Sequence, residues 1–293
     1  MTTKTASWLP GAALLALIWV QPAAAEADGA LSMLRIGMVA HPAAGDRIDG
    51  AALIERAFSE ATGLPTQIFV ARDFAALIEA QSRGRIDYGV YSAAAYATAR
   101  LACDCLEPIA APIDSDGATG LRAVRIERRD ESGETSDIAI VHGDVTTWLA
   151  AMPPGGKTDS EHFVDAGTAS HAEAMVLSGE AKGIIGWIPS RPGATPRGGT
   201  LSRLVAAGIA EDDLAVVWRS EPLRFGPHAV RSDMPDALRT TLIRFLTGLH
   251  DAQPDVFQHL EPTLQGGFVR VSDADYALAK AMVTHLAEAA PAR

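Results

Sequence analysis

The stretch at residues 85–100, RIDYGVYSAAAYATAR, decides the fold class. Its apolar run, 86–90, has the composition of a short buried strand, and the small residues after it favour a helix that begins at once. A strand that passes directly into a helix is typical of parallel sheets, whose ligands bind at the carboxyl ends of the strands. Tyr91 and Ser92 stand at such an end, so we expect a binding site there.

The same alternation of strand and helix continues on both sides of this stretch. LRIGMVA (34–40) and TQIFVA (66–71) are predicted strands, and the apolar spacing of 49–63 predicts a helix between them. Asp73 is placed to cap the next helix. A turn-rich connector, DSDGATG (114–120), precedes a second α/β segment, and the final segment is helical. The pattern predicts an α/β protein of two domains.

The amino-terminal segment predicts export. Lys4 is the only charged residue before Glu26, and an apolar core from Trp8 to Val20 precedes three alanines at 23–25. Such a core is short for a membrane span and fits a signal peptide over residues 1–25, with a retained anchor as the competing interpretation. Without Lys4 the net charge changes from −11 to −12. This acidity argues against nucleic acid or an anionic membrane surface as partner.

The two cysteines of the chain, Cys103 and Cys105, are separated by one residue. A disulfide closing so short a loop is uncommon, so we expect the cysteines to be unbonded. They are then either two small residues at a helix end, which is the favoured interpretation, or a site for a soft metal or metalloid.

Enzyme signatures are absent from the sequence. No nucleophile-elbow, phosphate-loop or dinucleotide-binding motif occurs. The histidines are scattered without the spacing of four residues by which one helix holds a metal. We therefore expect no catalytic residue, no cofactor and no metal, and an exported enzyme remains a hypothesis without a nucleophile.

Three stretches in order carry a resemblance to a known family. They are LRIGMVA with the segment 69–99, GTASHAEAMVLSGEAKGIIGW (167–187), and LAVVWRSEPLRFGPHAVRSDMPDALRTTL (214–242). Together they resemble the phosphate/phosphonate-type periplasmic solute-binding proteins of ABC transporters, which have the type II binding-protein fold. The likeness covers most of the chain after the signal peptide.

The resemblance implies a two-lobed α/β fold, each lobe a mostly parallel sheet flanked by helices, with two crossover hinges. One lobe is expected from 33–118 and 225–293, and the other from 119–224. The implied function is capture of a small anionic ligand, such as a phosphate or phosphonate, by lobe closure for an ABC permease. The alternative is an accessory that presents its bound form to a membrane sensor kinase. The protein is expected to act as a monomer.

The resemblance also implies ligand-binding residues in each lobe. In the first lobe Phe74, Tyr91 and Ser92 match the family's aromatic residue and its strand-end tyrosine with the helix start behind it. A tyrosine hydroxyl there could donate to an oxyanion, although the same residue could pack between sheet and helix. Ser92 and the N–H groups of its helix could meet a negative charge.

In the second lobe the match departs from the family. Thr146 and Thr147 stand where the family has Ser-Thr-Ser-Gly, Thr168 replaces a serine, and Lys182 takes the place of an aspartate. These changes remove polar donors, so a more apolar pocket that includes Trp187 is expected to suit an organic ligand. The alternative for Trp187 is simple core filling.

Overall fold

The computed structural model describes residues 1–2, 31–40, 47–129, 136–153, 162–191 and 198–289. The predicted signal peptide, 1–25, lies outside the described residues except for its first two. Among the described residues, no helix has the length and apolar character needed to cross a membrane.

The first sheet is built from strands at both ends of the chain. Its strands are β1 (Leu34–Val39), β2 (Thr66–Ala71), β3 (Tyr88–Val90), β4 (Leu106–Pro112), β11 (His228–Arg231) and β12 (Phe268–Arg270), in the order β12-β4-β11-β3-β1-β2. β1 is parallel to β2 and β3, and β11 is antiparallel to β3 and β4 on its two sides. The carboxyl ends of β1, β2 and β3 therefore share one edge.

The second sheet comes from the middle of the chain. Its strands are β5 (Gly120–Arg128), β6 (Ile138–Ile140), β7 (Phe163–Asp165), β8 (Gly183–Ser190), β9 (Leu214–Arg219) and β10 (Leu223–Arg224), in the order β10-β5-β8-β6-β7 with β9 also on β5. β6 is parallel to β7 and β8, and β5 is antiparallel to β8, β9 and β10.

The α/β class with two helix-flanked sheets is confirmed, and both sheets are mixed. Most strands of each sheet point the same way. The reversed strands are β11 and β12 in the first sheet and β5 in the second; β11 and β5 lie inside their sheets and pair antiparallel with their neighbours.

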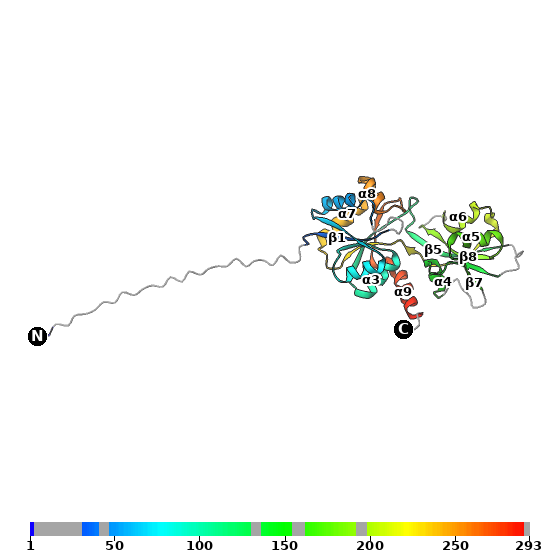
Figure 1. The fold of residues 1–293 in the computed structure, drawn as a ribbon, viewed down its shortest axis with the longest axis horizontal. Helices are drawn as coiled ribbons and strands as arrows, with labels where there is room; N and C mark the ends of the chain where they lie inside the picture. The colour runs from blue at the N-terminus through cyan, green and yellow to red at the C-terminus, as the bar shows by residue number, and fades with distance from the viewer. Residues whose placement is uncertain (3–30, 41–46, 130–135, 154–161, 192–197, 290–293) are drawn as a thin grey trace. The chain divides into compact units, whose positions relative to one another are not determined.

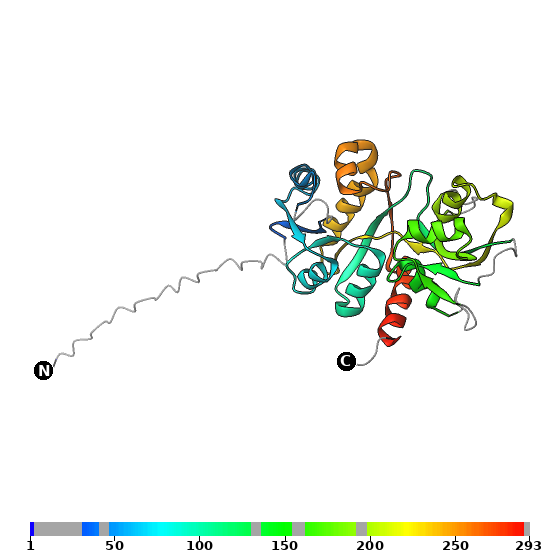
Figure 2. The ribbon, with the colours of Figure 1, turned by 45° about the vertical axis from the view of Figure 1, so that its right-hand side comes forward.

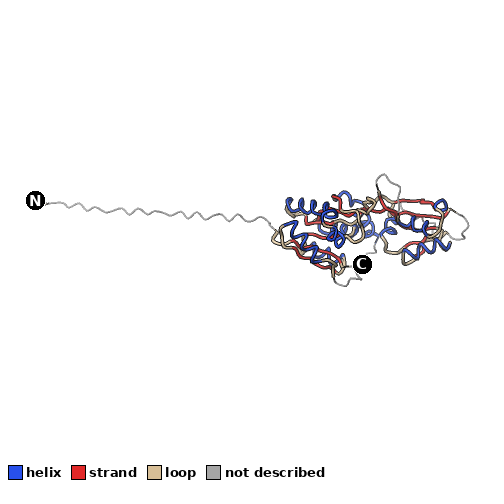
Figure 3. Tube along the Cα trace, turned by 90° about the horizontal axis from the view of Figure 1, so that it is seen from above, coloured by secondary structure: helices blue, strands red, loops and turns tan. Residues whose placement is uncertain are grey.

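Helices cover the strands (Figures 1 and 3). They are α1 (Ala51–Thr62), α2 (Phe74–Ser82), α3 (Ala93–Cys103), α4 (Val145–Ala151), α5 (Ala169–Ser178), α6 (Gly199–Ala206), α7 (Asp236–Ala252), α8 (Pro254–Leu260) and α9 (Ala277–Ala289). On the first sheet, α1, α7 and α8 enclose one apolar core. Helices α2, α3 and α9 enclose the other, and Figure 2 shows α9, in red, beside α3.

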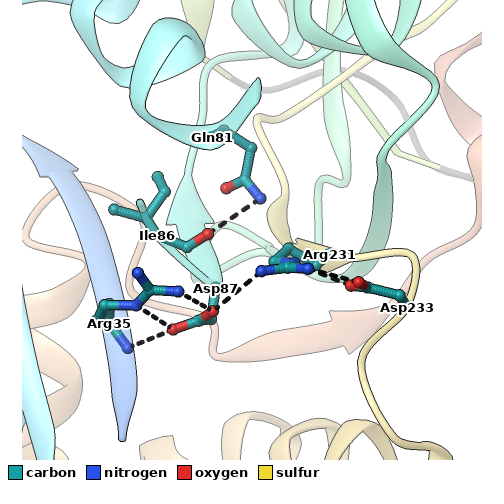
Figure 4. A network of polar contacts seen from close by, with 6 residues as sticks. All are labelled: Arg35, Gln81, Ile86, Asp87, Arg231 and Asp233. Carbon is teal, nitrogen blue, oxygen red and sulfur yellow. Dashed lines mark hydrogen bonds and ion pairs between the residues drawn. The ribbon is translucent and has the colours of Figure 1, made fainter. Parts of the chain in front are cut away.

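Ion pairs to a buried carboxylate hold the amino ends of β1 and β3. Asp87 has no solvent exposure and accepts hydrogen bonds from Arg35 Nε at 2.8 Å and Nη2 at 2.7 Å. Arg231 Nη1 lies 3.8 Å from the same carboxylate and also bonds Asp233 (Figure 4). This network joins β1, β3 and β11 at the edge opposite the carboxyl ends of β1 and β3, so we assign it a structural role.

The connection from β10 of the second sheet to β11 of the first packs against the end of β3 at Tyr91. A Cβ atom on Gly226 would lie 1.9 Å from the backbone oxygen of Tyr91, so only glycine fits this crossover. The Tyr91 N–H donates to the Pro227 carbonyl at 3.0 Å, and the Tyr276 hydroxyl donates to the Phe225 carbonyl at 2.9 Å. The crossover and the predicted site are therefore directly joined.

The expectation that the cysteines are unbonded is wrong. Cys103 and Cys105 form a disulfide, and their Cα atoms are 5.0 Å apart. Asp104 between them has a left-handed backbone, with φ of 47°. This turn brings the flanking Cα atoms into the range that a disulfide requires.

Candidate ligand-binding site

A pocket of ≈ 380 Å³ opens at the carboxyl edge of the first sheet. It is lined by Met38, Val39, Arg47, Ile48, Asp49, Phe74, Val90, Tyr91, Ser92, His259, Leu260 and Pro262. All three site residues predicted in the first lobe are on its wall. Its walls are mainly apolar with a few polar groups, which is the usual composition of a small-molecule site.

Two helix caps position the predicted residues. The Asp73 carboxylate accepts the Ala76 N–H at 2.7 Å, so α2 begins at Phe74, whose side chain stays 37% exposed. Ser92 caps α3 by accepting the Ala95 N–H at 3.1 Å. The first turn of a helix has N–H groups without helical partners and a partial positive charge, and at α3 this turn adjoins the pocket.

Tyr91 has the packing role that the sequence left open. It is 3% exposed, its ring lies where a Cβ atom on Gly89 would be, and its hydroxyl donates to Gln81 Oε1 at 3.2 Å. Burial raises the pKa of Tyr91, so the hydroxyl stays protonated. In this structure the hydroxyl is used inside the protein, and Tyr91 contributes to the pocket as part of its wall.

Sequence reasoning missed three polar residues of this pocket. Arg47 is exposed and is the one guanidinium among the described residues of the pocket wall, while Asp49 Oδ2 lies 3.1 Å from His259 Nδ1. Arg47 and Asp49 follow β1, so the rule that ligands bind at carboxyl ends could have found them. His259 comes from α8, and no local signal places that helix at the pocket.

The two threonines predicted in the second lobe are satisfied internally. Thr146 donates its hydroxyl to Asp144 Oδ1 at 2.6 Å, and Thr147 donates to the Val141 carbonyl at 2.9 Å. Both are 5% exposed. Asp144 caps α4 and also accepts the Thr146 N–H at 2.8 Å. A carboxylate of the protein therefore occupies the place at the helix start that an external anion would need.

A second aspartate occupies the neighbouring strand end. Asp165, at the end of β7, accepts the N–H groups of His142 and Gly167, each at 3.0 Å. These two bonds lower the pKa of Asp165, so it carries a negative charge at neutral pH. The exposed Thr168 uses its hydroxyl to cap α5, accepting the His171 N–H at 3.2 Å. This edge of the second sheet is acidic.

Trp187 does not line the first-sheet pocket. It lies in β8, with the Arg203 guanidinium 5.5 Å from its ring centre, and its backbone N–H donates to Thr200. Trp148 packs against the core of α2, α3 and α9. Lys182 pairs with Glu127 at 3.2 Å. These contacts are those expected of packing and surface residues.

Among the described residues, no group of three or more histidine, cysteine, aspartate or glutamate side chains is arranged to hold a metal ion. The disulfide also removes the free thiols that a soft metal or metalloid would need. Those thiols were the sequence feature that favoured a sensory accessory protein.

Two mixed sheets, joined by crossovers and carrying a pocket at a strand end, define the type II periplasmic binding-protein class. XAC2383 of Xanthomonas citri has this fold, with structures bound to chloride ion (TM-score 0.60, 13% identity, covering 89% of this chain and 100% of that chain) and to ATP (TM-score 0.59). PhnD1 of Prochlorococcus marinus, solved with methylphosphonate, is also similar (TM-score 0.51, 11% identity, 88% and 99% covered).

The sequence comparison defines the family. A model of the family described as "ABC transporter, phosphonate, periplasmic substrate-binding protein" matches residues 47–146 and 192–276. The match spans more than half of the chain. The protein belongs to this family, whose members are periplasmic and bind substrates for transport.

Proposed function

We propose that this protein is exported through its signal peptide, residues 1–25, and captures a small organic oxyanion for an ABC permease. The pocket at the carboxyl edge of β1 and β3 is the observation that carries the proposal. It combines a guanidinium, Arg47, with the start of α3 and with an apolar wall that includes Phe74. Cation and helix start would bind the acidic group, and Phe74 would contact the organic part.

We also propose that two lobes close over the ligand. One lobe comprises residues 33–118 and 225–293, and the other comprises residues 119–224. The strand composition of the two sheets supports these boundaries. Closure would bring the edge that carries Asp144 and Asp165 towards the ligand, with bending at the crossovers near Gly117–Gly120 and Leu223–Pro227. Thr146, Thr147, Thr168 and Trp187 would then act as supports for this edge more than as direct donors.

The negative charges at the edge that carries Asp144 and Asp165 restrict the net charge of the ligand. Asp144 and Asp165 accept N–H groups that could otherwise hold an anion, and each adds a negative charge. A ligand with a second negative charge would meet repulsion there. We therefore propose a monoanionic organic acid, such as an alkylsulfonate or a singly ionised alkylphosphonate, over a dianion such as sulfate.

A thermal-shift screen of residues 26–293 tests the proposal with methanesulfonate, methylphosphonate, longer alkyl analogues, phosphate and sulfate. Ligand at about 100 times its dissociation constant adds about 2.7 kcal/mol to stability, which raises the melting temperature by several degrees. The proposal predicts shifts with the organic monoanions. Absence of a shift with every compound would contradict it.

Asp144→Asn tests the charge argument separately. Asparagine is as good a helix cap as aspartate, so the variant should fold while losing one negative charge. Affinity for methylphosphonate should rise by about tenfold or less as the repulsion is removed. Asp212→Asn, an exposed charge in the short helix Glu211–Asp213, is the matched control and should leave affinity unchanged. Equal behaviour of the two variants would remove Asp144 from the site.

A further inference from the structure

The Cys103–Cys105 disulfide lies at the opposite end of α3 from the pocket. Cys103 is the last residue of α3, and Cys105 directly precedes β4. Both cysteines are half-buried, and the Asp104 side chain between them is 84% exposed. A reagent in solution can therefore approach this loop.

The bond is poorly placed to stabilise the fold. A disulfide stabilises mainly by restricting the unfolded chain, and this effect is smallest for the shortest loop. The turn is also held by other bonds. The Asp104 N–H donates to the Arg100 carbonyl at 3.0 Å, and Arg100 Nη1 donates to the Leu106 carbonyl at 2.9 Å. The Ser232 N–H donates to the Cys105 carbonyl at 3.0 Å.

Reduction would therefore leave the backbone of this turn in place. With the two Cα atoms held 5.0 Å apart, the thiols would remain positioned to reform the bond. The Arg100 guanidinium, paired with Asp104 at 2.6 Å and with Asp273 at 3.3 Å, adds a further contact that holds the turn. A short, accessible disulfide in a frame held by other bonds has the properties of an exchange site rather than of a structural crosslink.

We propose that Cys103 and Cys105 form a reversible thiol–disulfide exchange site whose reaction partner is a dithiol. A thiolate of the dithiol attacks one cysteine sulfur, the Cys103–Cys105 bond breaks, and the other cysteine leaves as a thiolate that takes up a proton. The second thiol of the partner then attacks the mixed disulfide and releases the remaining cysteine. The protein gains two electrons and two protons, and the partner becomes a disulfide.

This inference is independent of the transported ligand, because it concerns a surface that does not line the pocket. The folded protein is treated with dithiothreitol, quenched by alkylation, and its free thiols are counted by mass spectrometry while circular dichroism follows the fold. Both thiols should appear together in the folded state, at a rate within about tenfold of that in urea. Oxidised glutathione should restore the disulfide. Thiols that appear only when the protein unfolds would overturn the proposal.

Two variants give a second test. Cys105→Ser should form a stable mixed disulfide of Cys103 with glutathione in the folded protein, because the resolving thiol is absent. The double variant Cys103→Ser with Cys105→Ser should fold and melt within a few degrees of the wild type. Failure of the double variant to fold would show that the bond is structural and would also overturn the proposal.

Discussion

Acidification should destabilise this protein through one buried histidine. His228 is 1% exposed, contacts the Tyr88 hydroxyl through Nδ1, and packs against Phe268 with ring centres 4.6 Å apart. Among the described residues, its Nε2 atom has no hydrogen-bond partner. Burial lowers the pKa of His228 from 6.5 to about 3. Between these two pKa values, His228 is therefore protonated in the unfolded state but not in the folded state.

The sign and size of the effect follow from this difference in pKa. Stability is full above pH 6.5 and falls as the pH drops towards 3, because only unfolded His228 is protonated in that window. Each pKa unit corresponds to about 1.36 kcal/mol, so the loss between pH 7 and pH 5 is about 2 kcal/mol. This loss should lower the melting temperature by about 4 to 8 °C.

Urea titrations at pH 7 and pH 5 measure the loss directly. His228→Asn is the matched variant, since an amide can still contact Tyr88 but does not titrate. The variant is expected to be less stable than the wild type at both pH values. Its loss of unfolding free energy between pH 7 and pH 5 should be smaller than that of the wild type by about 2 kcal/mol. An unchanged difference would refute the assignment to His228.

Three substitutions test the packing that positions the site. Asp87→Ala should cost about 1.5 to 3 kcal/mol in urea unfolding, because it removes charged hydrogen bonds from the half-exposed Arg35 guanidinium; Asp87→Asn should cost less, and equal losses would contradict this. Gly226→Ala should cost about 1 to 3 kcal/mol by forcing the crossover off Tyr91, whereas Gly248→Ala, with open space in α7, should be neutral or stabilising. Asp73→Ala should cost about 1 kcal/mol by removing the cap of α2, and no change in melting temperature would contradict the cap.

The local structure of the first sheet was predictable from the sequence. β1 and α1 lie within the predicted segments 34–40 and 49–63, and Asp73 caps α2 as expected. These features depend on periodicity and capping, which are local properties. The insertion of β11 between β3 and β4 joins residues more than 100 positions apart, and no local pattern specifies such a pairing.

The candidate site was predictable only in part. The strand-end rule predicted Tyr91 and Ser92, and the family resemblance predicted Phe74; all three line one pocket, but neither source could tell which way the Tyr91 ring would turn. Gly89 lies two residues earlier on the same face of β3 and leaves the space that the ring fills. The disulfide was missed because it depends on the left-handed turn at Asp104, a conformation that aspartate adopts only occasionally.

We propose that the first-sheet pocket binds an organic monoanion. Isothermal titration of methanesulfonate and sulfate into wild type and Phe74→Ala measures this binding and its preference for a monoanion. We expect methanesulfonate to bind wild type at least about tenfold more tightly than sulfate, a difference of about 1.4 kcal/mol, and Phe74→Ala to lose the part of this preference that comes from contact with the methyl group. Equal affinity for the two anions in wild type, or an unchanged preference in Phe74→Ala, would contradict the account.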